Sequence, residues 1–128
     1  MSERVDAFGI RIDLLDMAGA VRHVYSNVEL GRRDCRLVIT PNVDHIVKLQ
    51  RDAAFRAAYA AADLVVIDGW PVASALRWLG HDVPGTVPGS DLVPALFDAA
   101  GASGGVSVFL LGAADGVAER AAGEIGGR

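Results

Sequence analysis

An aspartate ends one of the most apolar runs of this chain. Residues 64–67, "LVVI", are followed directly by Asp68 and Gly69, and Pro71 comes after one further residue. A carboxylate at the end of a buried strand can act as a general base on a hydroxyl group that lies within its reach. It can also be an ordinary turn residue. A role as helix cap is less favoured, because with Pro71 in the first helical position the cap would be Trp70.

Two polar side chains follow a second apolar run. Thr40 and Asn42 flank Pro41 in "TPN", at the end of the run over residues 36–40. Asn42 suits the N-cap of a helix that begins near Val43. A threonine hydroxyl and an asparagine amide on one loop can also orient a sugar hydroxyl. The capping and binding interpretations concern different atoms and are compatible.

Two further segments could contact a phosphate group or a sugar. Gly112 follows "VFLL", and a glycine there lets the backbone approach a phosphate at a helix N-terminus, although a tight turn explains it equally well. The segment "GSDL" over residues 89–92 reads as a helix start, with Ser90 or Asp91 as its cap. No GxGxxG motif is present, and His23 and the other histidines lack metal-ligand spacing. We therefore expect neither a cofactor nor a metal site.

Short β-branched runs alternating with helical patterns must position these residues. Buried strands are predicted over residues 36–40, 64–67 and 106–111, and a weaker strand or hairpin over residues 4–13. Helices are predicted over residues 16–30, 43–62 (as one helix or two), 71–79, 91–100 and 115–125. This order predicts an α/β fold, a Rossmann-like three-layer sandwich with a mostly parallel sheet. The carboxyl ends of its strands would then share one rim, which predicts that Thr40, Asn42, Asp68 and Gly112 surround one cleft.

Size and composition suit a single α/β domain over residues 1–128. The net charge of −4 gives no reason to expect nucleic acid as a partner. One cysteine, Cys35, excludes a disulfide framework, and no run resembles a signal peptide or a membrane-spanning helix. We therefore expect a cytoplasmic protein. A sheet of few strands that stops after a strand–helix unit suggests a truncated domain, and a compact small natural domain is the alternative.

Taken together, the polar segments resemble one bacterial family. The stretches are "TPNVDHIVKLQRDAAFRAAYAAADLVVIDGWPV", "VPGSDLVPALF" and "VFLLGAADGVAERAA", in that order. They are similar to the WecG/TagA/CpsF glycosyltransferases, which include N-acetylmannosaminyltransferases. The resemblance implies an inverting transfer of an N-acetylmannosamine-type or related hexose from a UDP-sugar. The implied acceptor is linked to undecaprenyl diphosphate, typically as undecaprenyl-diphosphate-N-acetylglucosamine. The implied products are teichoic acid, capsule and exopolysaccharide.

The resemblance also implies roles for particular residues. Asp68 matches the catalytic base, and five residues match substrate-binding positions: Thr40, Asn42, Gly69, Asp91 and Gly112. Thr86 stands where the family commonly has an arginine. Family members are longer, and the resemblance implies peripheral contact with the inner face of the cytoplasmic membrane through a C-terminal part that this chain lacks. Apolar surface left exposed would favour a homo-oligomer. A non-catalytic sugar-nucleotide-binding or assembly module with the same fold is the alternative, and the activity of this chain alone is left open.

Overall fold

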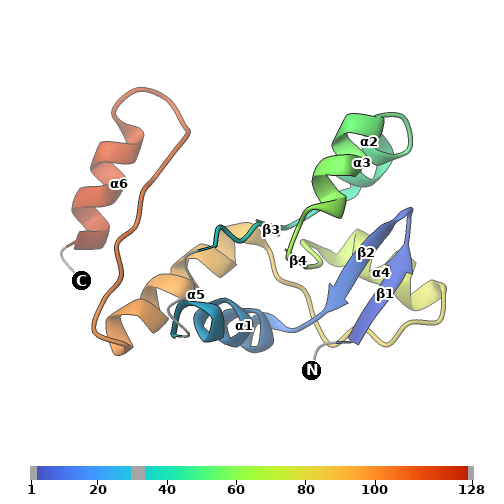
Figure 1. Ribbon diagram of the computed structural model, residues 1–128, viewed down its shortest axis with the longest axis horizontal. Coiled ribbons are helices and arrows are strands. Elements are labelled where there is room, and N and C mark those ends of the chain that lie inside the picture. The colour runs from blue at the N-terminus through green and yellow to red at the C-terminus, as the bar shows by residue number, and fades with distance from the viewer. Residues whose placement is uncertain (1–2, 30–33, 127–128) are drawn as a thin grey trace. The chain divides into compact units, whose positions relative to one another are not determined.

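The computed structural model describes residues 3–29 and 34–126. By their internal contacts, the residues form two compact units, Met1–Leu92 and Val93–Arg128. Six helices and two small sheets make up the described part of the chain (Figure 1), which confirms a mixed α/β composition. The expectation of a single domain stays a prediction.

The first unit begins with a β-hairpin. Strands β1 (Glu3–Ala7) and β2 (Ile10–Leu14) pair antiparallel, so the predicted hairpin is confirmed. Phe8 and Gly9 form its two-residue turn with φ angles of 56° and 79°. Positive φ at both central residues matches the turn type whose twist fits a hairpin. Its apolar residues Val5, Ala7, Ile10, Ile12 and Leu14 are buried, which gives the hairpin one face toward the core.

A buried carboxylate joins this hairpin to the rest of the unit. Asp13 in β2 is 3% exposed, and its Oδ1 accepts a hydrogen bond of 2.6 Å from Nε of Arg4 in β1. Its Oδ2 accepts a hydrogen bond of 2.9 Å from the backbone N–H of Val65 in the next sheet. One side chain therefore satisfies a strand N–H and a guanidinium together, as a buried carboxylate must.

A short parallel pair forms the second sheet. Strands β3 (Val38–Ile39) and β4 (Leu64–Val65) pair in register, and the N–H of Val66 continues the pairing by donating to the carbonyl of Ile39 at 3.0 Å. The regular strands are therefore shorter than predicted. The segment after β4 nevertheless stays in the core, because Val66 and Ile67 are both fully buried.

Four helices belong wholly to the first unit. Helix α1 (Met17–Glu29) begins where Asp16 Oδ1 accepts the N–H of Gly19 at 2.7 Å, and its predicted end at Leu30 lies outside the described residues. The pattern over residues 43–62 forms two helices, α2 (Val43–Leu49) and α3 (Ala53–Ala60), with Asp52 as the cap of α3.

Helix α4 (Trp70–Trp78) starts one residue earlier than predicted. Its cap is Gly69, so the expectation that Trp70 is the cap is wrong. Pro71 takes the second helical position, where its missing N–H has no intrahelical partner to lose.

The core of the first unit gathers side chains from the hairpin, from β4 and from α2, α3 and α4. Its most buried members are Ile12, Leu49, Ile67, Ala73 and Leu76. No helix in the described part of the chain is both long and apolar enough to cross a membrane.

The second unit differs from the prediction. Helix α5 (Gly89–Ala102) crosses the boundary between the units, and α6 (Val117–Gly126) follows it. The predicted strand over residues 106–111 is wrong, because no described backbone segment pairs with it. Phe109 is 88% and Leu111 92% exposed. An apolar run becomes a strand only when a partner satisfies its N–H and C=O groups. The Rossmann-like sandwich with a mostly parallel sheet therefore stays a prediction.

The role of Asp13 predicts a large loss of stability on truncation. Asp13→Ala leaves the N–H of Val65 without its acceptor and Arg4 without its carboxylate. The free energy of unfolding should fall by about 2–4 kcal/mol, measured by urea denaturation. Asp6→Ala, at an exposed position of β1, should change it by less than about 0.5 kcal/mol. Equal effects of the two substitutions would contradict the role assigned to Asp13.

A buried tyrosine predicts a second change, at high pH. Tyr59 in α3 is 4% exposed, its hydroxyl lies 2.8 Å from Nδ1 of His45, and burial raises its pKa to about 12. The folded state favours the neutral phenol. The contribution of neutral Tyr59 to the free energy of unfolding is therefore fully present below pH 10.0, and it is lost as the pH rises through about 12. The free energy of unfolding should fall less steeply across this range in Tyr59→Phe than in the wild type. Parallel curves for the two proteins would rule out Tyr59 as the source.

Candidate functional site

Two predicted site residues lie at the same edge of the parallel pair. Thr40 directly follows β3, and Asp68 follows the buried continuation of β4. Because the two strands are parallel, both residues leave the sheet at its carboxyl edge, where ligands bind in open α/β sheets. Both are half-buried. This is the edge at which the sequence predicts the catalytic and binding residues.

The start of α5 lies at the same edge. The backbone N–H of Gly89 donates to Oδ1 of Asp68 at 3.2 Å. A Cβ added to Gly89 would lie 3.1 Å from Oγ1 of Thr40. Gly89 thus contacts both polar residues, and the small residue leaves just enough room for the threonine hydroxyl. We call Thr40, Asp68 and Gly89 the carboxyl-edge cluster.

The contact with Gly89 gives Asp68 a structural role and leaves one of its carboxylate oxygens without a hydrogen bond in the described part of the chain. A carboxylate at a helix N-terminus is stabilised by the free N–H groups and by the helix dipole. The hydrogen bond occupies Oδ1 and fixes the side chain. No donor among the described residues hydrogen-bonds to Oδ2, so this oxygen remains able to accept a proton from a bound hydroxyl group. Asp68 is therefore neither a simple turn residue nor the cap of the helix that directly follows it.

Asn42 and Gly69 occupy cap positions close to this cluster in sequence. Oδ1 of Asn42 accepts the N–H of His45 at 2.9 Å, which confirms the predicted cap of α2. Asn42 is exposed, so its amide nitrogen faces solvent. Gly69 caps α4 without a side chain. The cap roles fix the loops that follow β3 and β4, and binding roles for the two residues stay predictions.

Asp91 lies in the first turn of α5 and is exposed. Because α5 starts at Gly89, Ser90 and Asp91 are both inside the helix, and the expectation that one of them is its cap is wrong. Asp91 is close to the cluster in sequence, two residues after Gly89, but it forms no hydrogen bond with Thr40 or Asp68. Thr86 is half-buried in the loop before α5 and brings no positive charge.

Gly112 belongs to the second unit and has φ of 121°, a conformation that favours glycine. It does not open a helix directly, because α6 begins only at Val117, so the expected position at a helix N-terminus is wrong. Its place on one rim with the carboxyl-edge cluster stays a prediction.

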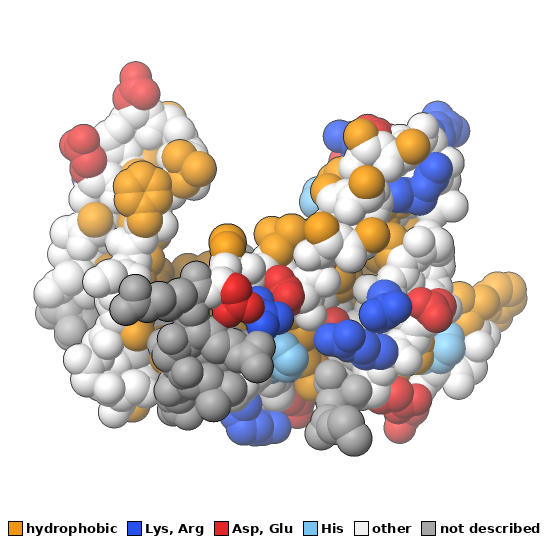
Figure 2. Space-filling view, in the orientation of Figure 1, with side chains coloured by type: hydrophobic (Ala, Val, Ile, Leu, Met, Phe, Trp, Pro, Cys, Tyr) orange, Lys and Arg blue, Asp and Glu red, His pale blue; other side chains and the backbone are white. Residues whose placement is uncertain are grey.

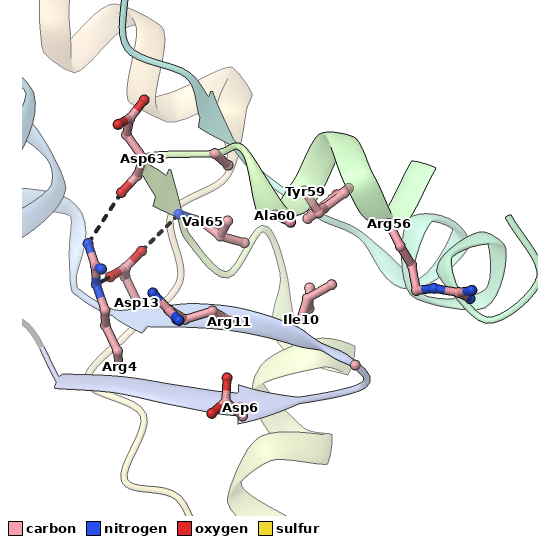
Figure 3. Close-up of a pocket in the computed structure, with 12 residues that line it drawn as sticks. Arg4, Asp6, Ile10, Arg11, Asp13, Arg56, Tyr59, Ala60, Asp63 and Val65 are labelled. Carbon is pink, nitrogen blue, oxygen red and sulfur yellow. Dashed lines mark hydrogen bonds and ion pairs between the residues drawn. The ribbon is translucent and has the colours of Figure 1, made fainter. Parts of the chain in front are cut away.

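A cavity that the sequence did not predict lies elsewhere in the first unit. Its volume is about 240 Å³, between the hairpin, α3 and the start of β4 (Figure 3). Charged side chains line it: Arg4, Asp6, Arg11, Asp13, Arg56 and Asp63. It lies at the beginning of β4, whereas Asp68 follows the end of that strand. The cavity and the carboxyl-edge cluster therefore lie at opposite ends of β4.

Most of the charges around this cavity already stabilise the fold. Asp13 pairs with Arg4, and Arg4 also donates to the carbonyl of Asp63 at 3.4 Å. Hydrogen bonds from the N–H of Leu37 and then from Arg36 lower the pKa of Asp63. No signal in the sequence marks Asp13, because a charged residue between Ile12 and Leu14 is typical of the solvent-facing side of a hairpin strand. No group of histidine, cysteine or acidic side chains among residues 3–29 and 34–126 could hold a metal ion.

Comparison with known proteins shows the family to which the chain belongs. The model of the glycosyl transferase WecG/TagA/CpsF family matches residues 5–128, nearly the whole chain. A search of curated proteins finds no significant match. The match is to a class of enzymes that transfer sugars in the synthesis of cell-surface polysaccharides, and these enzymes need a sugar donor and an acceptor. The chain belongs to the WecG/TagA/CpsF family.

The contact between Asp68 and Gly89 predicts how substitutions of Asp68 affect stability. Asp68→Ala removes the acceptor for the N–H of Gly89 and should lower the free energy of unfolding by about 1 kcal/mol. Asp68→Asn keeps an acceptor oxygen and loses only the charge near the helix N-terminus, which is worth about 0.3–1 kcal/mol. Thermal and urea denaturation of the two variants measure the difference. A more stable Ala variant would show that the contact does not hold α5.

Proposed function

We propose that this protein is an inverting glycosyltransferase that moves a sugar from a UDP-sugar to an acceptor linked to undecaprenyl diphosphate. The donor sugar is of the N-acetylmannosamine type or a related hexose. The products belong to cell-surface polymers such as teichoic acid, capsule and exopolysaccharide. The reaction takes place where the lipid carrier lies, at the cytoplasmic face of the membrane.

The observation that carries this proposal is the carboxyl-edge cluster in a chain that belongs to a glycosyltransferase family. Asp68 is held through Oδ1 by the N–H of Gly89, at the edge where Thr40 also lies. A fixed carboxylate with one oxygen free is what a general base for a hydroxyl group requires.

In the proposed reaction, Asp68 takes up the proton and UDP leaves with the electron pair of the broken bond. Oδ2 of Asp68 accepts the proton of the acceptor hydroxyl group while its oxygen attacks the anomeric carbon of the donor. The bond between that carbon and the diphosphate oxygen breaks, and UDP leaves with the electron pair. Attack from the face opposite UDP inverts the configuration at the anomeric carbon.

The other predicted residues bind substrate in this proposal. The hydroxyl of Thr40 and the amide of Asn42 orient sugar hydroxyl groups, since both follow the same strand. Gly69 and Gly112 allow the backbone to approach the substrate, and Asp91 accepts hydrogen bonds from sugar hydroxyls. The two substrates and their proposed contacts do not involve a metal or a cofactor.

A non-catalytic sugar-nucleotide-binding module is the alternative, and one observation favours it. Thr86 supplies no positive charge where the family commonly has an arginine, and charge that develops on leaving UDP needs preorganised stabilisation. Such a module would bind the UDP-sugar without releasing UDP in the presence of an acceptor.

The proposed role of Asp68 predicts the behaviour of Asp68→Asn. This variant keeps the shape of the side chain and removes the base, so turnover should fall by about 10²–10⁴-fold. Affinity for the UDP-sugar should stay close to that of the wild type, because the base acts on the acceptor. The assay measures UDP released from UDP-N-acetylmannosamine with a short-chain lipid-diphosphate-N-acetylglucosamine as acceptor.

Asp82→Asn is the matched control, since Asp82 is exposed in the loop after α4 and should tolerate the same change. Normal turnover in Asp68→Asn would remove Asp68 from the chemistry and leave it with its structural role alone. UDP-sugar binding without acceptor-dependent UDP release by the wild type would favour the binding module.

A further inference from the structure

Both tryptophans of the chain lie on α4, and both are exposed. Trp70 is 75% exposed at the first position of the helix, and Trp78 is 88% exposed at the last. Leu79, next to Trp78, is 51% exposed, and Figure 2 shows that hydrophobic side chains reach the surface on the face that it draws. A tryptophan normally buries most of its large ring, so two that face solvent on one short helix need a reason.

The helix separates its core face from its exposed face. Val72, Ala73 and Leu76 are buried. Trp70 and Trp78 are eight residues apart, so at 100° per residue their directions differ by about 80°. Trp78 lies opposite the buried residues, whereas Trp70 lies about 60° from Ala73, at the border of the buried face. Periodicity therefore explains the exposure of Trp78 but not that of Trp70.

The two tryptophans differ in their distance from the proposed base. Trp70 is two residues after Asp68, so their Cα atoms lie at most about 7 Å apart. The residue between them is Gly69, which adds no side chain that could separate an indole from the carboxylate. Trp78 lies about 12 Å further along the helix axis. Only Trp70 is close enough to contact a sugar whose hydroxyl group reaches Asp68.

An indole suits one face of a pyranose ring. The axial C–H groups of a pyranose form an apolar patch that packs on the electron-rich face of an aromatic ring, and the indole N–H can donate to a ring hydroxyl. We propose that Trp70 binds the acceptor sugar by stacking against its ring, and thereby holds the attacking hydroxyl group at Oδ2 of Asp68. This inference rests on the proposed function, and it names the residue that positions the acceptor.

The acceptor fits better than the donor on geometric grounds. A general base must lie within hydrogen-bond reach of the hydroxyl group whose proton it accepts. The acceptor ring therefore lies beside Asp68, next to the first turn of α4. The donor sugar presents its anomeric carbon on the far side of that hydroxyl group and is held by its diphosphate elsewhere.

Fluorescence of single-tryptophan variants tests the inference without requiring turnover. Trp78→Phe leaves Trp70 as the one indole, and Trp70→Phe leaves Trp78 as the matched control. Each variant of the full chain is titrated with the methyl β-glycoside of N-acetylglucosamine in the presence of UDP. In Trp78→Phe, the emission should shift to shorter wavelength. The acrylamide quenching constant should fall roughly by half, because a stacked sugar covers one of the two ring faces. In Trp70→Phe, neither quantity should change.

Three results would overturn the inference. No change in Trp78→Phe would show that the sugar does not cover Trp70. Equal changes in both variants would point to a non-specific effect. A blue shift of both tryptophans on neutral phosphatidylcholine vesicles, without a response to the glycoside, would make the exposed face of α4 a lipid contact.

Kinetics separate failure of this inference from failure of the proposed function. Trp70→Ala should lower kcat/KM for the acceptor by about tenfold, which corresponds to 1.4 kcal/mol. Trp70→Phe should recover part of this loss, and Trp78→Ala should behave like the wild type. If Asp68→Asn loses turnover and Trp70→Ala does not, the inference fails and the proposed function stands. If Asp68→Asn keeps full turnover, the proposed function itself fails.

Discussion

The first unit depends on one buried carboxylate. Within the described residues, strand β4 pairs with another strand on one side only, and the N–H of Val65 would otherwise be buried without an acceptor. Asp13 supplies that acceptor from the hairpin, and Arg4 balances its charge. Because β4 leads directly into Asp68, this contact also fixes the segment that presents the proposed base. The stability of the hairpin and the geometry of the site therefore depend on the same side chain.

The sequence predicts local features of the fold better than its sheet. The hairpin, the cap at Asn42 and the two helices over residues 43–62 follow from turn chemistry and from periodicity, which act over a few residues. The prediction of a strand over residues 106–111 is wrong because an apolar run indicates that a segment avoids water, but it does not indicate which strand the segment pairs with. Asp13 was not recognised, since its partners Arg4 and Val65 lie 9 and 52 positions away in the sequence.

Part of the site could be predicted in the same way. Parallel strands bring Thr40 and Asp68 to one edge, as the alternation of strands and helices suggests. The contact between Asp68 and Gly89 could not be predicted, because it joins residues that are 21 positions apart through a backbone N–H. That contact reconciles the structural and chemical interpretations of Asp68, since one carboxylate oxygen holds α5 and the other stays free.

Backbone amide chemical shifts can show whether sugar substrates bind at the carboxyl-edge cluster. Proton–nitrogen correlation spectra are recorded as UDP-N-acetylmannosamine and a soluble N-acetylglucosamine glycoside are added. The largest shifts should occur at the amides of Thr40, Gly69 and Gly89. Larger shifts at Arg11 and Arg56, which line the cavity beside the hairpin, would exclude the carboxyl-edge cluster and move the substrate site to the opposite end of β4.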